Sequence, residues 1–124
     1  MEKIVFVCIN RTYRQFSSGI RVKGRESLYE CTRKYWPLDP NRANEAEYVA
    51  GVCNGIIKTI YKRTENWKSV RAFAEFFDDA EVKADSSLLN RYAFTGIEAE
   101  TEIKEKYINT RMPGRFYGIV SYNY

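Results

Sequence analysis

Histidine is absent from the 124 residues, and its absence excludes several classes of chemistry. The chain cannot build the common zinc sites that use imidazole, a Ser-His or Cys-His nucleophile pair, or a histidine general base. It also lacks a Walker-type phosphate loop and a Gly-x-Gly-x-x-Gly motif. We therefore expect a protein that is not an enzyme and that carries no cofactor.

Cysteine is scarce, and membrane signals are lacking. Cys8, Cys31 and Cys53 are odd in number, form no Cys-x-x-Cys motif and lie in apolar runs, which is typical of reduced, buried thiols in a cytosolic protein. The apolar start Met1–Ile9 is too short for a signal peptide, and no apolar run is long enough to span a bilayer. The sequence predicts a cytoplasmic protein with no membrane partner.

Acidic residues offer one candidate cation site. Asp78, Asp79 and Asp85 are close enough in sequence to bind a divalent cation, but their spacing is not that of an EF-hand loop. A loop of solvated carboxylates explains them more simply, so we expect no metal.

The most informative stretch that is present is Glu47–Arg63, in which Asn54-Gly55 separates two apolar, β-branched runs. Both residues of that dipeptide tolerate the positive φ angles of a two-residue hairpin turn. Neither strand has a polar face, so this hairpin should lie at the centre of a sheet that is covered on both sides. A turn at Asn54-Gly55 predicts the pairs Cys53–Ile56, Val52–Ile57, Ala50–Thr59, Val49–Ile60, Tyr48–Tyr61 and Glu47–Lys62.

Apolar periodicity predicts the remaining elements. Strands are expected at Lys3–Ile9, Asn90–Thr95 and Phe116–Tyr122, and helices at Arg25–Tyr35, after Asp39-Pro40 and at Glu98–Tyr107. Polar stretches predict a loop at Asn10–Ser18, with a continuation into a short strand at Ile20–Val22 as an alternative, and an exposed loop at Asp78–Ser87. Val70–Phe77 fits a helix or an irregular segment.

These elements predict the α+β class. We expect a small, mostly antiparallel, twisted or barrel-like sheet with a central Asn-Gly hairpin, covered by two to three helices. Residues 1–124 should form a single ligand-binding domain, because the chain is long enough for one core. The first and last strands are natural neighbours in such a sheet.

Arginine repeatedly stands beside aromatic residues or amides in a chain with 15% aromatic residues and a net charge of +4. Arginine forks suit phosphate, and flat rings suit a base, so this composition favours nucleotide binding. The small charge excess, spread along the chain, weighs against a nucleic-acid partner. A small RNA- or DNA-binding module and a protein–protein inhibitor remain alternatives that use the same residues.

Five short motifs follow one another between positions 29 and 96. They are Tyr29-x-x-Thr32-Arg33-x-Tyr35-Trp36, Arg42-Ala43-x-x-Ala46-x-x-Val49, Asn54-Gly55-Ile56-Ile57-x-x-Ile60-Tyr61, Trp67, and Arg91-Tyr92-x-Phe94-x-Gly96. This order resembles the Thoeris anti-defence protein family, phage sponges that sequester a cyclic ADP-ribose signal of a bacterial immune system. The chain departs from the family pattern at Val70–Ser87 and Gly118–Tyr124.

The resemblance implies a non-catalytic protein of the host-cell cytoplasm that holds a cyclic ADP-ribose-type nucleotide without cleaving it. It also implies a homo-oligomer with pockets near subunit contacts and a second site for other cyclic nucleotides. For such a ligand we expect Arg91 and Arg111 to bind phosphate, and Phe94 and Tyr92 to stack on the base. Asn90 and Asn109 are expected to make polar contacts to the base edges. Arg25 and Arg11 are secondary candidates.

Overall fold

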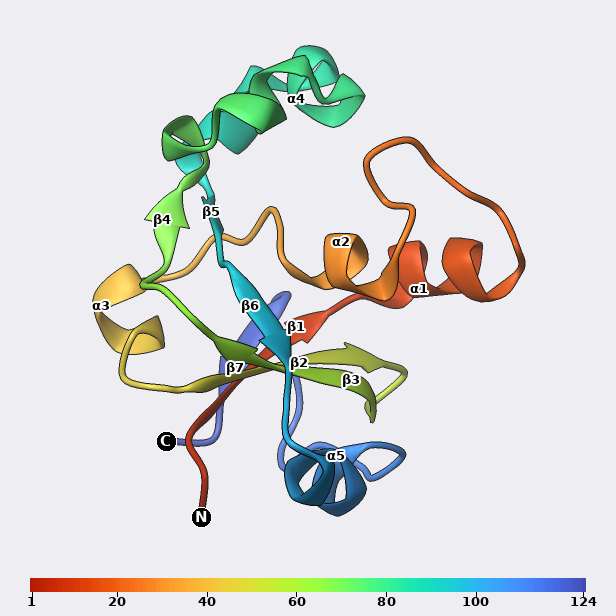
Figure 1. Cartoon of the computed structure of the whole chain (residues 1–124), viewed down its shortest axis with the longest axis vertical. Coiled ribbons are helices and arrows are strands. Elements are labelled where there is room, and N and C mark those ends of the chain that lie inside the picture. Colours follow the sequence, from red (N-terminus) through yellow and green to blue (C-terminus); the bar gives the residue numbers. More distant parts are fainter.

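A five-stranded open sheet forms the centre of the molecule (Figure 1). The computed structural model describes residues 1–124. The strand order is β6-β3-β2-β1-β7, in which only β1 and β2 run parallel. The α+β prediction is therefore confirmed, and the sheet does not close into a barrel. The bounds of its strands are β1 Ile4–Cys8, β2 Tyr48–Cys53, β3 Ile56–Arg63, β6 Gly96–Glu98 and β7 Val120–Tyr122.

The β2–β3 hairpin turns at Asn54-Gly55, whose φ angles are 52° and 78°. The two pairs nearest the turn follow the predicted register. Beyond them the register shifts by one residue, because Gly51 pairs with Thr59 and leaves Lys58 as the extra residue of a β-bulge. The predicted pairs beyond the bulge are therefore wrong, and the observed ones are Ala50–Ile60, Val49–Tyr61 and Tyr48–Lys62.

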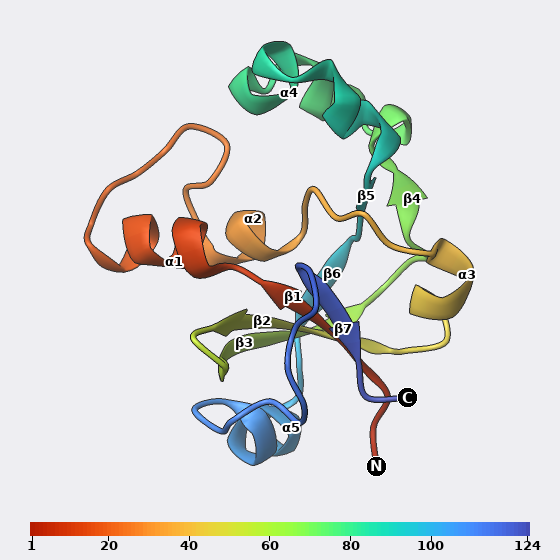
Figure 2. The same ribbon diagram turned by 180° about the vertical axis from the view of Figure 1, so that it is seen from behind.

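Both faces of the sheet are covered, as the apolar pattern predicts. Figure 1 and the reverse view in Figure 2 show the helix α5 (Thr101–Tyr107) on one side and the helices α1 (Asn10–Ser17) and α2 (Leu28–Thr32) on the other. Below α5, the core includes Phe6 and Ile60. On the opposite face, Phe94 and the two tryptophans pack against Val5, Val7 and Val49. Every residue of β2 is buried, because β2 is a central strand of this two-sided core.

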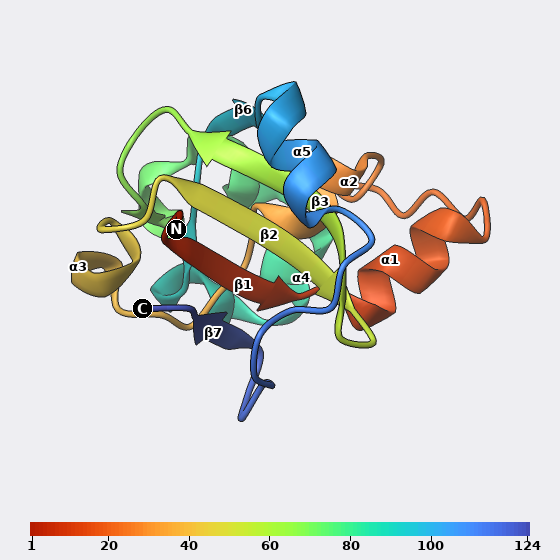
Figure 3. The ribbon, with the colours of Figure 1, turned by 90° about the horizontal axis from the view of Figure 1, so that it is seen from below.

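The chain enters and leaves the sheet through neighbouring strands. β7 pairs antiparallel with β1, which confirms the expected contact between the first and last strands. Figure 3 shows β1 and β7 adjacent, with both chain ends on this side of the sheet. β7 and β6 are the two edge strands.

Asn10–Ser18, expected to be a loop, forms helix α1, and no strand forms at Ile20–Val22. The sequence pattern does contain a helical signal, since Ile9, Tyr13 and Phe16 recur at helical spacing. The Tyr13 amide donates to the Ile9 carbonyl over 2.7 Å. Arg11 and Arg14 are exposed, and the many polar residues of this stretch led to the prediction of a loop.

A group of short helices stands apart from the sheet at the top of Figure 1. We call residues Val70–Arg91 the helical head. It is joined to the rest of the chain by a two-stranded stem, β4 (Lys68–Ser69) and β5 (Tyr92–Ala93). The exposed loop predicted at Asp78–Ser87 is wrong, because it contains helix α4 (Ala80–Ala84) and its buried Val82. The head also contains 3₁₀ helices at Val70–Ala72, Ala74–Asp78 and Ser86–Asn90.

The other helices are shorter than the sequence pattern predicts. α2 begins at Leu28 and ends at Thr32, inside the predicted Arg25–Tyr35. The predicted cap at Asp39 is confirmed, since its carboxylate accepts the Asn41 amide at the start of α3 (Pro40–Ala43). None of the helices is both long and apolar enough to cross a lipid bilayer.

Gly96 begins β6 and pairs with Arg63 of β3. A Cβ atom at this position would lie 2.5 Å from the carbonyl oxygen of Lys62, a backbone atom that cannot move without shifting the strand. We expect Gly96→Ala to lower the free energy of unfolding by about 1–3 kcal/mol, measured by guanidinium denaturation. Gly118→Ala is the matched control, because a Cβ there meets no atom within 4 Å. Equal stability of the two variants would contradict this account of the strand contact.

Candidate functional site

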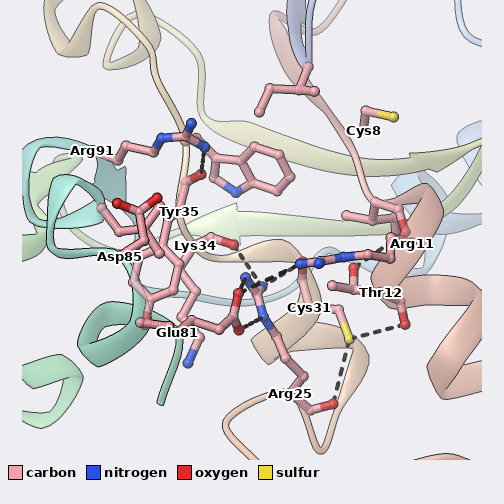
Figure 4. A pocket seen from close by; sticks show the side chains of 15 residues that line it. Cys8, Arg11, Thr12, Arg25, Cys31, Lys34, Tyr35, Glu81, Asp85 and Arg91 are labelled. Carbon is pink, nitrogen blue, oxygen red and sulfur yellow. Dashed lines mark hydrogen bonds and ion pairs between the residues drawn. The ribbon is translucent and has the colours of Figure 1, made fainter. Parts of the chain in front are cut away.

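A pocket of about 500 Å³ lies between the body of the protein and the helical head (Figure 4). Its wall on the body side comes from the end of β1, the first turn of α1 and the segment around α2. Its wall on the head side comes from α4 and the residues that lead into β5. The lining includes the apolar residues Ile9, Trp36, Ala84, Leu88 and Ile119 and the charged residues Arg11, Arg25, Lys34, Glu81, Asp85 and Arg91.

Arg25 and Glu81 form the principal ion pair across the pocket floor. The Arg25 Nε lies 2.7 Å from one carboxylate oxygen of Glu81, and its Nη2 lies 3.1 Å from the other. Its Nη1 donates to the carbonyls of Glu30, Cys31 and Lys34 at the exit from α2. All three guanidinium nitrogens therefore have protein partners, so Arg25 fastens the head to the body and has little capacity left for a ligand.

Lys34 and Asp79 form a second, more deeply buried pair. Their side chains are 4% and 5% exposed, and the ammonium lies 3.2 Å from the carboxylate. The same carboxylate oxygen accepts the Tyr35 hydroxyl at 2.5 Å, while the other accepts the amide of Glu81 at the start of α4. The Lys34 ammonium also contacts Glu30 at 3.2 Å. This buried network fixes the start of α4 against the body.

The network sets the charge states of its members. Burial alone raises the pKa of the Asp79 carboxyl, but the hydrogen bonds from Tyr35 and from the Glu81 amide, together with the Lys34 ammonium, bring it below its ordinary value. Burial and the bond to Asp79 raise the pKa of Tyr35. Asp79 is therefore ionised and Tyr35 neutral at physiological pH, which keeps the network intact.

Two arginines of the pocket keep most of their donors unused. Arg91 is half-buried, and its only protein partner is the Tyr35 carbonyl, 3.3 Å from Nη1. The Arg11 side chain is 78% exposed and reaches Glu81 only at 3.8 Å. Figure 4 shows that these two guanidinium groups enter the pocket from opposite sides, with the Arg25–Glu81 pair next to Arg11. They are the groups available to bind an anion in this pocket.

Asp85 contributes a carboxylate on the same side of the pocket as Arg91 (Figure 4). One of its oxygens accepts the amide and the hydroxyl of Ser87, at 3.1 and 2.6 Å. These hydrogen bonds, with a smaller contribution from the charge of Arg91, lower the pKa of Asp85. The ionised group can accept hydrogen bonds from a ligand amine or hydroxyl, but it is poorly suited to donate a proton.

The thiol of Cys31 lines the pocket floor but is not activated. Its Sγ donates to the carbonyls of Thr12 and Arg25, at 3.8 and 3.6 Å. Burial raises its pKa, although the charge of Arg25 opposes the rise. A thiol of this kind is a weak nucleophile, because the thiolate is the reactive form.

The structure brings together three of the expected site residues, Arg11, Arg25 and Arg91. It does not bring Tyr92 and Phe94 into the pocket. Phe94, expected to stack on a base, is completely buried, with Tyr29, Tyr61 and Trp67 around its ring. Tyr92 packs against the same core while its backbone pairs with Trp36. Both rings support the sheet, because alternation along this segment directs them toward the body.

Arg111, Asn90 and Asn109 also lie outside the pocket. Asn90 is exposed on the head, where its side-chain oxygen accepts a hydrogen bond from Arg71 Nη2 at 3.1 Å. Asn109 has a positive φ of 69° and donates its backbone amide to Ile57 as the chain leaves α5. Arg111 lies beside the hairpin turn, where its backbone forms an isolated antiparallel β-bridge with Ile56. The expectation that Arg91 and Arg111 share one phosphate site is therefore not met within one copy of the chain.

Sequence reasoning missed Lys34, Asp79, Glu81 and Trp36 as parts of this region. A signal for two of them was present, since Asp79 precedes Ala-Glu-Val-Lys-Ala, an N-cap followed by good helix formers with the acid first and the base last. The excess of acidic residues around Asp79 and Glu81 masked that signal. No local pattern reveals that these carboxylates meet Arg25 and Lys34, which lie some fifty residues earlier.

Replacement of Asp79 by asparagine removes a buried charge and leaves Lys34 with Glu30 as its remaining acidic partner. We expect Asp79→Asn to lower the free energy of unfolding at pH 7 by roughly 3 kcal/mol, measured by urea denaturation. Since the folded-state pKa of Asp79 lies below 3.8, its stabilising effect is complete above that pH and is lost as the pH falls through the folded pKa. The difference in the free energy of unfolding between wild type and Asp79→Asn should therefore become smaller as the pH falls below 3.8.

Asp78→Asn is the matched control, because Asp78 is exposed and forms no ion pair. It should leave the stability nearly unchanged at both pH values. A constant gap between wild type and Asp79→Asn from pH 7 to below 3.8 would show that the Asp79 charge does not hold the head.

Comparisons of this chain with known protein families, with curated protein sequences and with solved structures find no match.

Proposed function

We propose that this protein is a non-catalytic sponge that binds a cyclic ADP-ribose-type signalling nucleotide in the pocket between the body and the helical head. The observation that carries the proposal is the pair Arg11 and Arg91, two guanidinium groups with unused donors on opposite sides of a pocket with apolar lining. A cavity of about 500 Å³ lies in the range of small-molecule sites.

The pocket matches the parts of such a ligand. Arginine forks bind phosphate oxygens in a bidentate manner, so Arg11 and Arg91 can grip the pyrophosphate from two sides. Asp85 can accept hydrogen bonds from a ribose hydroxyl or a base amine. Trp36, Leu88 and Ile119 provide apolar surface for the rest of the ligand.

The chemistry of the pocket supports binding without turnover. Cys31 is a poor nucleophile because its pKa is raised, and Asp85 is a poor proton donor because its pKa is lowered. The Glu81 carboxylate is occupied by its pair with Arg25. A sponge needs affinity and no reaction. The proposal includes membership of the Thoeris anti-defence family, assembly as a homo-oligomer and action in the cytoplasm of the host cell, as the resemblance implies.

Retention of an intact ligand tests the proposal directly. We expect the protein, in excess over cyclic ADP-ribose, to hold the nucleotide above an ultrafiltration membrane. Heat denaturation should then release it with unchanged mass, measured by liquid chromatography and mass spectrometry. Free passage of the nucleotide would refute the proposal for this ligand, and release of a cleaved product would show an enzyme.

Substitution of the two available arginines tests the pocket. A charge-assisted hydrogen bond contributes about 2 kcal/mol, so Arg91→Ala and Arg11→Ala should each weaken binding of cyclic ADP-ribose roughly 30-fold, measured by calorimetry. Arg71→Ala is the control, because Arg71 lies on the same head but outside the pocket, bonded to Asn90. Equal affinity of all three variants and wild type would place the ligand elsewhere.

A further inference from the structure

Positive charge is concentrated in three segments that contain no acidic residue. Residues 3–25, 48–64 and 106–124 hold twelve of the twenty basic residues, and all sixteen acidic residues lie outside them. In the linear sequence these segments are separated by acidic stretches, so the overall excess looks small and dispersed. The fold brings parts of all three segments together at one end of the molecule.

The meeting point is the tip of the β2–β3 hairpin. Figures 1 and 2 both show this tip between α1 and the chain that follows α5. The contacts agree, since the Asn10 side chain accepts the Asn54 amide at 3.0 Å, and the Met112 amide donates to the Gly55 carbonyl at 2.9 Å. Residues from all three segments therefore meet at the hairpin tip.

Three basic side chains flank the tip. Arg14 donates from Nη2 to the Asn54 side-chain oxygen at 3.0 Å. Arg111 approaches from the other side, and its Nη1 lies 3.1 Å from the position that a Cβ of Gly55 would occupy. Lys58 follows in β3 at the bulge, with its ammonium 5.5 Å from the Tyr13 ring. We call Arg14, Lys58 and Arg111 the tip cations.

None of the tip cations has an acidic partner, whereas most basic residues of the body and the stem do. Lys62 contacts both Glu47 and Glu100, and Lys106 contacts Glu2. Arg14, Lys58 and Arg111 appear in no ion pair. Like charges held together without counter-charges create a positive potential that an anionic partner can neutralise.

Aromatic rings with cationic neighbours lie on two of the three segments, α1 and the chain that follows α5. Phe16 of α1 lies under Arg21 at 4.1 Å, and Tyr117 lies beside Arg115 at 5.2 Å. Tyr117 is 90% exposed, so its ring is available to a partner. Cations that track a phosphate backbone, with rings on which unpaired bases stack, are the pattern of single-strand binding surfaces.

We propose that the hairpin tip binds single-stranded nucleic acid, with the tip cations on successive phosphates and Tyr117 available for base stacking. This surface is distinct from the pocket, because none of the tip cations lines that pocket. The proposal does not depend on the sponge function. It revises the expectation against nucleic acid, which rested on charge that looks dispersed in the sequence.

The salt dependence of binding tests this proposal. Each phosphate contact on a single strand contributes about 0.7 to the slope of log affinity against log salt concentration, so three contacts give a slope of about −2. Affinity for a fluorescein-labelled oligothymidylate of about 12 nucleotides should therefore fall about 20-fold between roughly 50 and 200 mM potassium chloride, measured by anisotropy. Arg14→Gln, Lys58→Gln and Arg111→Gln should each reduce the slope by about 0.7.

The charge-matched control is the triple variant Lys68→Gln, Arg71→Gln, Lys83→Gln, which removes the same charge from the stem and the head. It should bind like wild type. The triple variant that combines Arg14→Gln, Lys58→Gln and Arg111→Gln should bind at least tenfold more weakly at the lowest salt concentration. Equal binding by the two triple variants would overturn the proposal, as would an affinity that does not change with salt. Tighter binding to vesicles with anionic lipids than to the oligonucleotide would assign the surface to a membrane instead. Circular dichroism checks that each variant is folded.

Discussion

The pocket exists because buried charges on the helical head meet buried charges on the body. The head is joined to the body by the two-stranded stem, whose strands have only two residues each. So short a stem alone could not fix the position of the head. Arg25 with Glu81 and Lys34 with Asp79 hold it, together with the small apolar core around Tyr35 and Phe76. A buried ion pair is costly to break, because loss of one partner leaves the other charge buried without a counter-charge. The same contacts therefore hold the head and shape the space beneath it.

The number of protein partners separates structural arginines from available ones. Arg25 uses all three guanidinium nitrogens within the protein. Arg33 donates to the Phe94 carbonyl and lies among the rings of Tyr29, Phe73 and Phe76, so it too belongs to the fold. Arg11 and Arg91 have few partners, and so have the tip cations. Burial and saturation, and not the type of residue, decide which cations can receive an anion.

The two proposed binding regions follow from one feature of the topology. β1 runs parallel to β2 and then leads directly into α1, which places Arg11 beside the pocket and both Asn10 and Arg14 beside the hairpin tip. Arg11 and Arg14 are one turn apart, yet Arg11 serves the pocket and Arg14 serves the tip. One short helix thus connects a small-molecule pocket with a charged surface.

The sequence by itself determined the hairpin turn at Asn54-Gly55, the buried strands on either side of it, the cap at Asp39 and the α+β class. These features depend on local backbone preference and on apolar periodicity, which any short window of residues contains. It could not determine the bulge at Lys58, because one extra residue in a strand that is apolar on both faces leaves no mark in the apolar periodicity. The tertiary structure alone decided that Phe94 is core and that Arg25 is saturated. It alone decided that the acidic stretch is a docked helix and that scattered cations meet at one tip, since each of these depends on partners remote in the chain.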